Sequence, residues 1–239
     1  MRILVVNVNT TTSMTDSIVA AARAAASPGT EIVGLTPTFG ADSCEGNVDS
    51  YLAAVGVLDV VSKHPEPFDA VVQAGFGEHG REGLQEFLDV PVVDITEAAA
   101  IIASLLGHKF GVVTTLDRTV PLIEDRLMLA GLDRRCAAVV ASGLGVLELE
   151  EDPERTLATI VAKAKEIVAM RGVEVICLGC GGMAGLDEAV AQATGAPIVD
   201  GVASAVALAE SLVRMNLTTS KVRTYAPQRR KSLSGWPLP

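Results

Sequence analysis

The chain carries one pattern twice, and this repeat constrains its fold more than any other feature. Each copy follows an apolar run and consists of a glycine turn, a helix-like stretch and a short Pro-Val-Val-Asp or Pro-Ile-Val-Asp segment. The copies run from Gly75 to Asp94 and from Cys180 to Asp200. Two such units facing each other would place positions 75 and 180 on opposite walls of one cleft. One wall then carries a thiol and the other carries only a hydrogen atom.

Strand-like and helix-like patterns alternate along the chain and restart near Gly107. Continuous Val, Ile and Leu runs between helices are typical of parallel sheets that are buried on both faces. We therefore predict an α/β fold with two pseudo-symmetric halves, each a mostly parallel four-stranded sheet flanked by helices. The active-site cleft is expected between the halves. The predicted first half spans residues 1–98 plus about 206–239, and the second spans 99–205.

Composition excludes several classes of partner. A net charge of −10 and 3% aromatic residues argue against nucleic-acid binding. No signal peptide or membrane-spanning run is present, so we expect a cytoplasmic protein that does not bind membranes. The cysteines lack a second C-x-x-C or a histidine pair, which argues against a metal site. A small-molecule substrate is the expected partner.

Four loops combine small polar residues with glycine at the predicted carboxyl ends of strands, where α/β proteins bind ligands. Hydroxyl, amide and backbone N–H groups of this kind suit a compact anion or an imide. Phe39 and Gly40 follow another strand and could form an apolar wall for a substrate side chain. The candidate substrate-binding residues are Asn9, Thr10, Phe39, Gly40, Phe76, Gly77, Thr114, Thr115, Gly181 and Gly182.

Cys180 is the strongest catalytic candidate. It lies between glycines just before a predicted helix, where the helix end and nearby N–H groups favour the thiolate. A thiolate there can act as a base or a nucleophile. Cys177 lies inside a predicted strand and is interpreted as a core residue. Asp94 and Asp200 end equivalent strands and are predicted to cap the helices that follow.

The chain resembles the aspartate/glutamate/hydantoin racemase superfamily and, within it, the hydantoin and allantoin racemase branch. The matching stretches are Met1–Thr12, Phe76-Gly77-Glu78, Val112–Arg118, Leu178–Met183, Pro197–Asp200 and Thr219-Ser-Lys221. The resemblance implies a homo-oligomer, a tetramer or a hexamer. It also implies a cofactor-independent racemase of 5-substituted hydantoins or similar cyclic ureides. In that mechanism two cysteines face each other across a carbon acid; the second matches Cys180, which acts as acid/base, and the first belongs at Gly75.

The chain departs from the family pattern in three places: Val8 replaces a proline, Gly75 replaces the cysteine, and Glu78-His79 replaces Asp-Pro. Three explanations are open. In the first, His79 or Glu78 is the second base. In the second, the enzyme transfers a proton on one face of the planar intermediate only, as a single-cysteine decarboxylase or a cis–trans isomerase of a small dicarboxylate. In the third, Gly75 is an engineered or impairing change. One-face chemistry with glycine opposite one thiol occurs in arylmalonate decarboxylases of this superfamily. A ureide-binding protein without catalysis is the non-enzymatic alternative.

Overall fold

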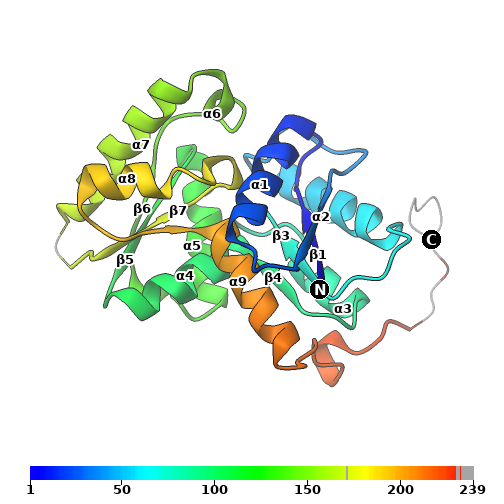
Figure 1. Cartoon of the computed structure of the whole chain (residues 1–239). Helices are drawn as coiled ribbons and strands as arrows, with labels where there is room; N and C mark the ends of the chain where they lie inside the picture. Colours follow the sequence, from blue (N-terminus) through cyan, green and yellow to red (C-terminus); the bar gives the residue numbers. More distant parts are fainter. Residues whose placement is uncertain (171, 230–231, 233–239) are drawn as a thin grey trace.

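The computed structural model describes residues 1–170, 172–229 and 232, and shows two four-stranded parallel sheets (Figure 1). The first sheet has the order β2-β1-β3-β4 and the second has the order β6-β5-β7-β8, so both follow one topology. The predicted fold class is confirmed. The strands are β1 (Arg2–Val6), β2 (Glu31–Leu35), β3 (Ala70–Gln73), β4 (Val92–Asp94), β5 (Phe110–Thr114), β6 (Cys136–Ala141), β7 (Val175–Leu178) and β8 (Ile198–Asp200).

Helices cover both faces of each sheet, which explains the uninterrupted apolar strands (Figure 1). Every residue of β3 and β7 is buried. The α-helices are α1 (Thr12–Ala25), α2 (Asn47–Ser62), α3 (Arg81–Phe87), α4 (Ile95–Leu106), α5 (Val120–Leu129), α6 (Glu148–Glu151), α7 (Pro153–Val168), α8 (Asp187–Thr194) and α9 (Gly201–Arg214). The 3-10 turns are η1 (Asp117–Thr119), η2 (Asp133–Arg135), η3 (Gly181–Met183) and η4 (Arg223–Tyr225).

Helices α4 and α9 occupy equivalent places in the two halves and pack against each other. The carboxylate of Asp94 accepts hydrogen bonds from the N–H groups of Thr96 and Glu97, at 2.8 and 2.9 Å. Asp200 caps α9 in the same way, through Val202 and Ala203. Both predicted helix caps are confirmed. Each helix also packs on the sheet of the other half, α4 on β7 and α9 on β3, and the predicted division at residues 98 and 205 stays a prediction.

The described part of the C-terminal segment folds back against α3. The ammonium group of Lys221 donates to the carbonyls of Gln85 and Glu86, and the Thr219 hydroxyl donates to the carbonyl of Val90. Residues 230–231 and 233–239, which fall in the predicted first half, lie outside the described residues.

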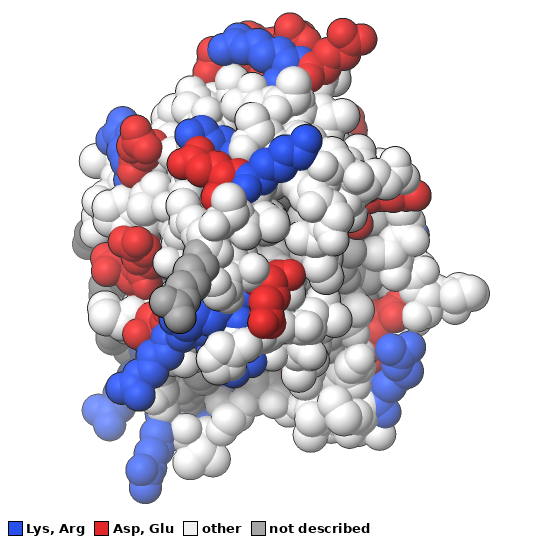
Figure 2. All heavy atoms as spheres, turned by 90° about the vertical axis from the view of Figure 1, so that its left-hand side faces the viewer, with Lys and Arg blue, Asp and Glu red and all other residues white. Residues whose placement is uncertain are grey.

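The surface of the second half carries mixed charge on the side that Figure 2 shows. Basic and acidic side chains alternate there, with broad uncharged areas between them. Among the described residues, no helix combines the length and the apolar character needed to cross a membrane. The cytoplasmic location and the homo-oligomer stay predictions.

Candidate active site

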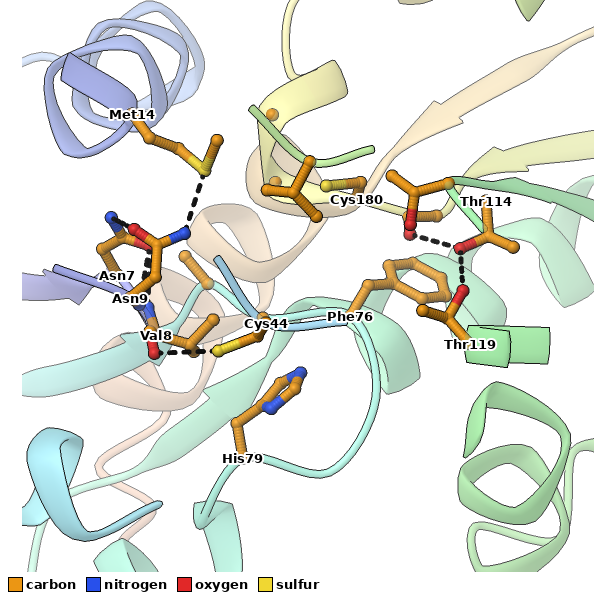
Figure 3. A pocket seen from close by; sticks show the side chains of 17 residues that line it. Asn7, Val8, Asn9, Met14, Cys44, Phe76, His79, Thr114, Thr119 and Cys180 are labelled. Carbon is orange, nitrogen blue, oxygen red and sulfur yellow. Dashed lines mark hydrogen bonds between the residues drawn. The ribbon is translucent and has the colours of Figure 1, made fainter. Parts of the chain in front are cut away.

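A cavity lies where the loops after β1, β3, β5 and β7 meet between the two halves (Figure 3). About 40 Å³ of it is open to the centres of water molecules, which is room for a few waters. Its lining residues are Asn7, Val8, Asn9, Met14, Cys44, Ala74, Gly75, Phe76, His79, Thr114, Thr115, Thr119, Val146, Gly179, Cys180, Gly181 and Gly182. The repeat therefore brings both halves to one site.

Most of the predicted site residues meet in this cavity. The residues brought together are Asn9, Gly75, Phe76, His79, Thr114, Thr115, Cys180, Gly181 and Gly182. The predicted residues that lie outside its lining are Thr10, Phe39, Gly40 and Gly77. The Thr10 hydroxyl bonds the carbonyl of Ala41, and Gly40 is exposed to solvent. Gly77 donates its N–H to the hydroxyl of Thr96 at 2.8 Å, which turns it toward α4.

Cys180 ends the loop after β7, at the start of the 3-10 turn η3, and remains partly exposed. Burial raises the pKa of its thiol to about 11, and the hydrogen bond from the N–H of Gly182 opposes this rise. The expected lowering of the pKa of the Cys180 thiol is therefore wrong. The helix that follows directly is one short turn, and α8 begins only at Asp187, so little helix dipole reaches the sulfur.

Gly181 is required by the contact between the halves. A Cβ at this position would lie 2.8 Å from the carbonyl oxygen of Ala74. The end of β3 therefore touches the turn that carries Cys180. This contact fixes the distance between the two walls of the cavity.

Threonines form the second-half side of the cavity. The Thr114 hydroxyl, buried, contacts the Thr119 hydroxyl at 3.1 Å and donates to the carbonyl of Gly179 at 3.2 Å. These bonds tie the loop after β5 to the loop after β7. Thr115, the next residue after Thr114, also lines the cavity.

Asparagines form the first-half side. The Asn7 amide donates to the side-chain oxygen of Asn9 at 2.8 Å and to the Thr15 hydroxyl at 3.0 Å. The Asn9 amide in turn donates to the sulfur of Met14 at 3.2 Å. Figure 3 shows this chain of side chains across the cavity from Thr114. Asn7 is thus a structural support that the sequence analysis did not single out.

Gly75 lines the same cavity as Cys180 and has no side chain, but the space beside it is filled. A Cβ on Gly75 would overlap Cδ2 of His79, and it would lie 2.6 Å from Cγ1 of Val8. Val8 and His79, which depart from the family pattern together with Gly75 and Glu78, both lie beside Gly75. They form one altered wall.

His79 is buried within that wall, with 6% of its surface exposed. Burial lowers the pKa of its imidazole to about 4, and the Phe76 backbone and Asp94 oppose this shift. Its Nδ1 has no hydrogen-bond partner within the described residues. A buried nitrogen without a partner is uncommon in folded proteins.

Arg126 holds the loop that carries His79. Its guanidinium comes from α5 in the second half and is 2% exposed. It donates to the carboxylates of Glu78 at 2.8 Å and Glu82 at 2.6 Å, and also reaches Asp94 and Glu97. Glu78 itself accepts the N–H of Gly80. The loop is thus anchored on both sides of His79.

Cys44 also lines the cavity, which the sequence analysis missed. Its thiol donates to the carbonyl of Val8 at 3.2 Å. Burial raises the pKa of this thiol to about 12, with smaller contributions from Asp49 and Cys180. Cys44 lies in an irregular segment between β2 and α2. No periodicity or repeat marks such a segment in the sequence.

The lining contains no Lys, Arg, Asp or Glu among the described residues. Within the same residues, no three His, Cys, Asp or Glu side chains are grouped so that they could hold a metal ion. Cys177 is fully buried in β7, which confirms its interpretation as a core residue. The chemistry of the cavity therefore depends on thiols, an imidazole, hydroxyls, amides and backbone N–H groups.

Comparison with known proteins places this arrangement among racemases. The family model described as Asp/Glu/Hydantoin racemase matches residues 3–209. The chain is similar to an allantoin racemase structure from Pseudomonas fluorescens, with 67% identity, a TM-score of 0.97, and coverage of 98% of this chain and 100% of that one. It is similar to one from Klebsiella pneumoniae, with 40% identity, a TM-score of 0.95, and coverage of 98% and 96%. A hydantoin racemase from Rhizobium meliloti is 37% identical, with 98% of both chains covered.

Proposed function

The chain belongs to the Asp/Glu/hydantoin racemase family, and we propose that it interconverts the enantiomers of a 5-substituted hydantoin, with allantoin (5-ureidohydantoin) as the first candidate. The family and the class of enzyme, an isomerase, agree with the sequence analysis. The choice of allantoin is supported by the likeness to the allantoin racemases of Pseudomonas fluorescens and Klebsiella pneumoniae.

The uncharged lining of the cavity is the observation that carries this proposal. A cyclic ureide is neutral and presents ring carbonyl and N–H groups, which match the hydroxyls, amides and backbone N–H groups of the described lining. A carboxylate in the same cavity would lose its hydration without gaining a cationic partner. The lining therefore favours a ureide over an amino acid or a dicarboxylate.

The chemistry follows from the position of the Cys180 thiol. A proton on C5 of a hydantoin is acidic because the carbanion is delocalised onto the neighbouring carbonyl as an enolate. The turn that begins at Cys180 offers the N–H groups of Gly181 and Gly182, and Thr115 adds a hydroxyl. Donors aimed at a developing oxyanion stabilise it, and losing one such donor commonly lowers the rate by roughly a hundredfold or more. Cys180 moves the proton on its own face of the ring, and no cofactor is needed.

A second candidate is one-face chemistry, because Gly75 places no thiol opposite Cys180. A decarboxylase or a cis–trans isomerase would need only the Cys180 side. Its substrate would be a small dicarboxylate, and the described lining has no Lys or Arg side chain to pair with a carboxylate. We therefore rank it below the racemase.

Incubation of each pure enantiomer of allantoin with the protein in D2O tests the proposal. Proton NMR follows the C5 proton and circular dichroism follows the enantiomer, with a protein-free sample for spontaneous racemisation. We expect deuterium uptake together with loss of optical activity, and loss of both by a hundredfold or more in Cys180→Ser. Cys136→Ser, at the start of β6, is the matched control. Binding without uptake would favour a ureide-binding protein, and no binding would overturn the hydantoin substrate.

A further inference from the structure

We propose that Arg118 is a specificity-determining residue of this site, whose guanidinium donates hydrogen bonds to an acceptor oxygen on the 5-substituent of the hydantoin, such as the ureido oxygen of allantoin. This inference rests on the proposed function and names the kind of substituent that the site selects. Arg118 lies in the 3-10 turn η1 and is exposed to solvent. It lies outside the lining of the cavity, so it acts at the entrance and not on the reacting carbon.

Arg118 is bracketed in the chain by residues that line the cavity. Thr114 and Thr115 precede it, Thr119 follows it directly, and all three are lining residues. The Thr119 hydroxyl contacts that of Thr114 at 3.1 Å and donates to the carbonyl of Leu116 at 2.8 Å. The turn is thus held in place by its buried threonines, and Arg118 is its exposed residue beside the cavity.

The guanidinium of Arg118 reaches across to the first half of the molecule, where it lies against Gly46. A Cβ on Gly46 would lie 2.6 Å from Nη2 of Arg118 and 3.1 Å from its Cζ. The two residues before Gly46 belong to the cavity and its cover, since Cys44 lines the cavity and Glu45 accepts the N–H of Val146. The guanidinium therefore lies where the loops of the two halves meet at the entrance.

The hydrogen-bonding capacity of this guanidinium is not used by the protein. Arg126, by comparison, binds four carboxylates. In the part of the chain that the structure describes, Arg118 makes no ion pair and donates no side-chain hydrogen bond, although Asp117 is its neighbour in the chain. A guanidinium has five N–H donors in a planar fork, which suits the oxygen of a carbonyl or a carboxylate.

The donors on the floor of the cavity set the direction of the 5-substituent. Hydroxyls, amides and backbone N–H groups at the carboxyl ends of the strands match the ring carbonyl and N–H groups, and C5 must lie at Cys180. The 5-substituent therefore extends away from the strands, toward the loops at the entrance. An apolar substituent there would displace water from the Arg118 guanidinium without pairing with it. A ureido oxygen would replace that water, and sites of this kind discriminate strongly against analogues that lack the polar group.

Racemisation of allantoin and of 5-isobutylhydantoin by the native protein and by Arg118→Met tests the inference. The ureido and isobutyl groups share one branched shape, and only the ureido group has an acceptor oxygen. Circular dichroism gives kcat/KM for each compound. We expect Arg118→Met to lower kcat/KM for allantoin by roughly ten- to a hundredfold, as for loss of a hydrogen bond to a charged group, and to change that for 5-isobutylhydantoin by less than about twofold. Where 5-isobutylhydantoin turns over too slowly, its inhibition constant against allantoin replaces kcat/KM.

Gly46→Ala tests the same contact from the other half. The backbone at Gly46 is extended, with a φ of −167°, and accepts a side chain, but the new Cβ would displace the guanidinium. We expect this variant to lose activity selectively toward allantoin. The double variant with Arg118→Met should lose no more than Arg118→Met alone, because both changes remove one interaction.

Arg134→Met, on the exposed turn η2, is the matched control and should leave both compounds unaffected. Unchanged kcat/KM for allantoin in Arg118→Met would overturn the inference. So would an equal loss for both compounds in a variant with native circular dichroism, which would assign Arg118 a structural role only. Native protein that racemises neither compound would instead defeat the proposed function itself.

Discussion

The guanidinium of Arg126 lies 2.8 Å from the carboxylate of Glu78, although the two residues belong to different halves of the molecule. Arg126 also contacts Glu82, Asp94 and Glu97. Arg81 contacts the same three carboxylates. This network joins α5 to the loop of His79. It therefore links the stability of the fold to the geometry of the site.

Replacing Arg126 should be strongly destabilising. Arg126→Met fills a similar volume, but the buried carboxylate of Asp94 loses one of its two arginine partners. Removing one partner of a buried pair commonly lowers the free energy of unfolding by about 3–5 kcal/mol. We expect the lower end of that range, because Glu78 and Glu82 are about half exposed. Urea denaturation measures the effect, with Arg134→Met on the exposed turn η2 as control. Equal midpoints for the two variants would contradict a structural role for the network.

The same network should make the folded state sensitive to acid. Burial opposes ionisation of Glu82, but hydrogen bonds and charge from Arg126 and Arg81 prevail and lower the pKa of its carboxyl to about 2. A carboxyl whose pKa is lower in the folded state stabilises the fold above its unfolded pKa of about 4.3. That contribution is lost as the pH falls from about 4.3 toward 2. Urea midpoints at pH 6 and pH 3 should therefore differ more in the native protein than in Arg126→Met.

Removing Glu45 should shift the pH profile of racemisation. Burial raises the pKa of the Cys180 thiol to about 11, and the charge of Glu45 contributes to this rise. In Glu45→Gln the thiol should therefore ionise at a lower pH, and the alkaline limb of kcat/KM should move downward. An alkaline limb at the same pH in both proteins would contradict a contribution from Glu45. Circular dichroism at each pH separates titration from unfolding.

Restoring a thiol at position 75 should create strain. In Gly75→Cys the new Cβ meets His79, Val8 and Gln73. Overpacking of this kind commonly lowers the free energy of unfolding by about 1–3 kcal/mol. Adding His79→Ala should recover part of the loss, and a double-mutant cycle in urea measures the coupling between the two positions. A cycle without coupling would show that His79 does not fill the space beside Gly75.

The repeat in the sequence was sufficient to predict the two sheets, the meeting of Gly75 and Cys180 at one cavity, and the caps at Asp94 and Asp200. These features depend on the local alternation of apolar strands and amphipathic helices and on parallel-sheet topology, and both can be inferred from the periodicity of the sequence. Cys44 and Val146 were missed because their loops have no periodicity, and only tertiary packing brings them to the cavity. The pKa of Cys180 was mispredicted for a related reason. Burial depends on both halves together, whereas the sequence shows only the neighbouring glycines.

Loop contacts over the cavity predict a closed resting state. The carboxylate of Glu45 accepts the N–H of Val146 at 2.8 Å, which joins a first-half loop to a second-half loop. The cavity of about 40 Å³ is far smaller than ligand sites of roughly 300–1,000 Å³, so these loops must separate to admit a ureide ring. Glu45→Ala should therefore speed alkylation of Cys180 by iodoacetamide several-fold, since it loosens the loops and removes a negative charge that raises the thiol pKa. Peptide mapping by mass spectrometry distinguishes Cys180 from the other cysteines, and the exposed Glu154→Ala at the start of α7 is the control. If both variants react at the native rate, the Glu45–Val146 contact does not limit access to the thiol.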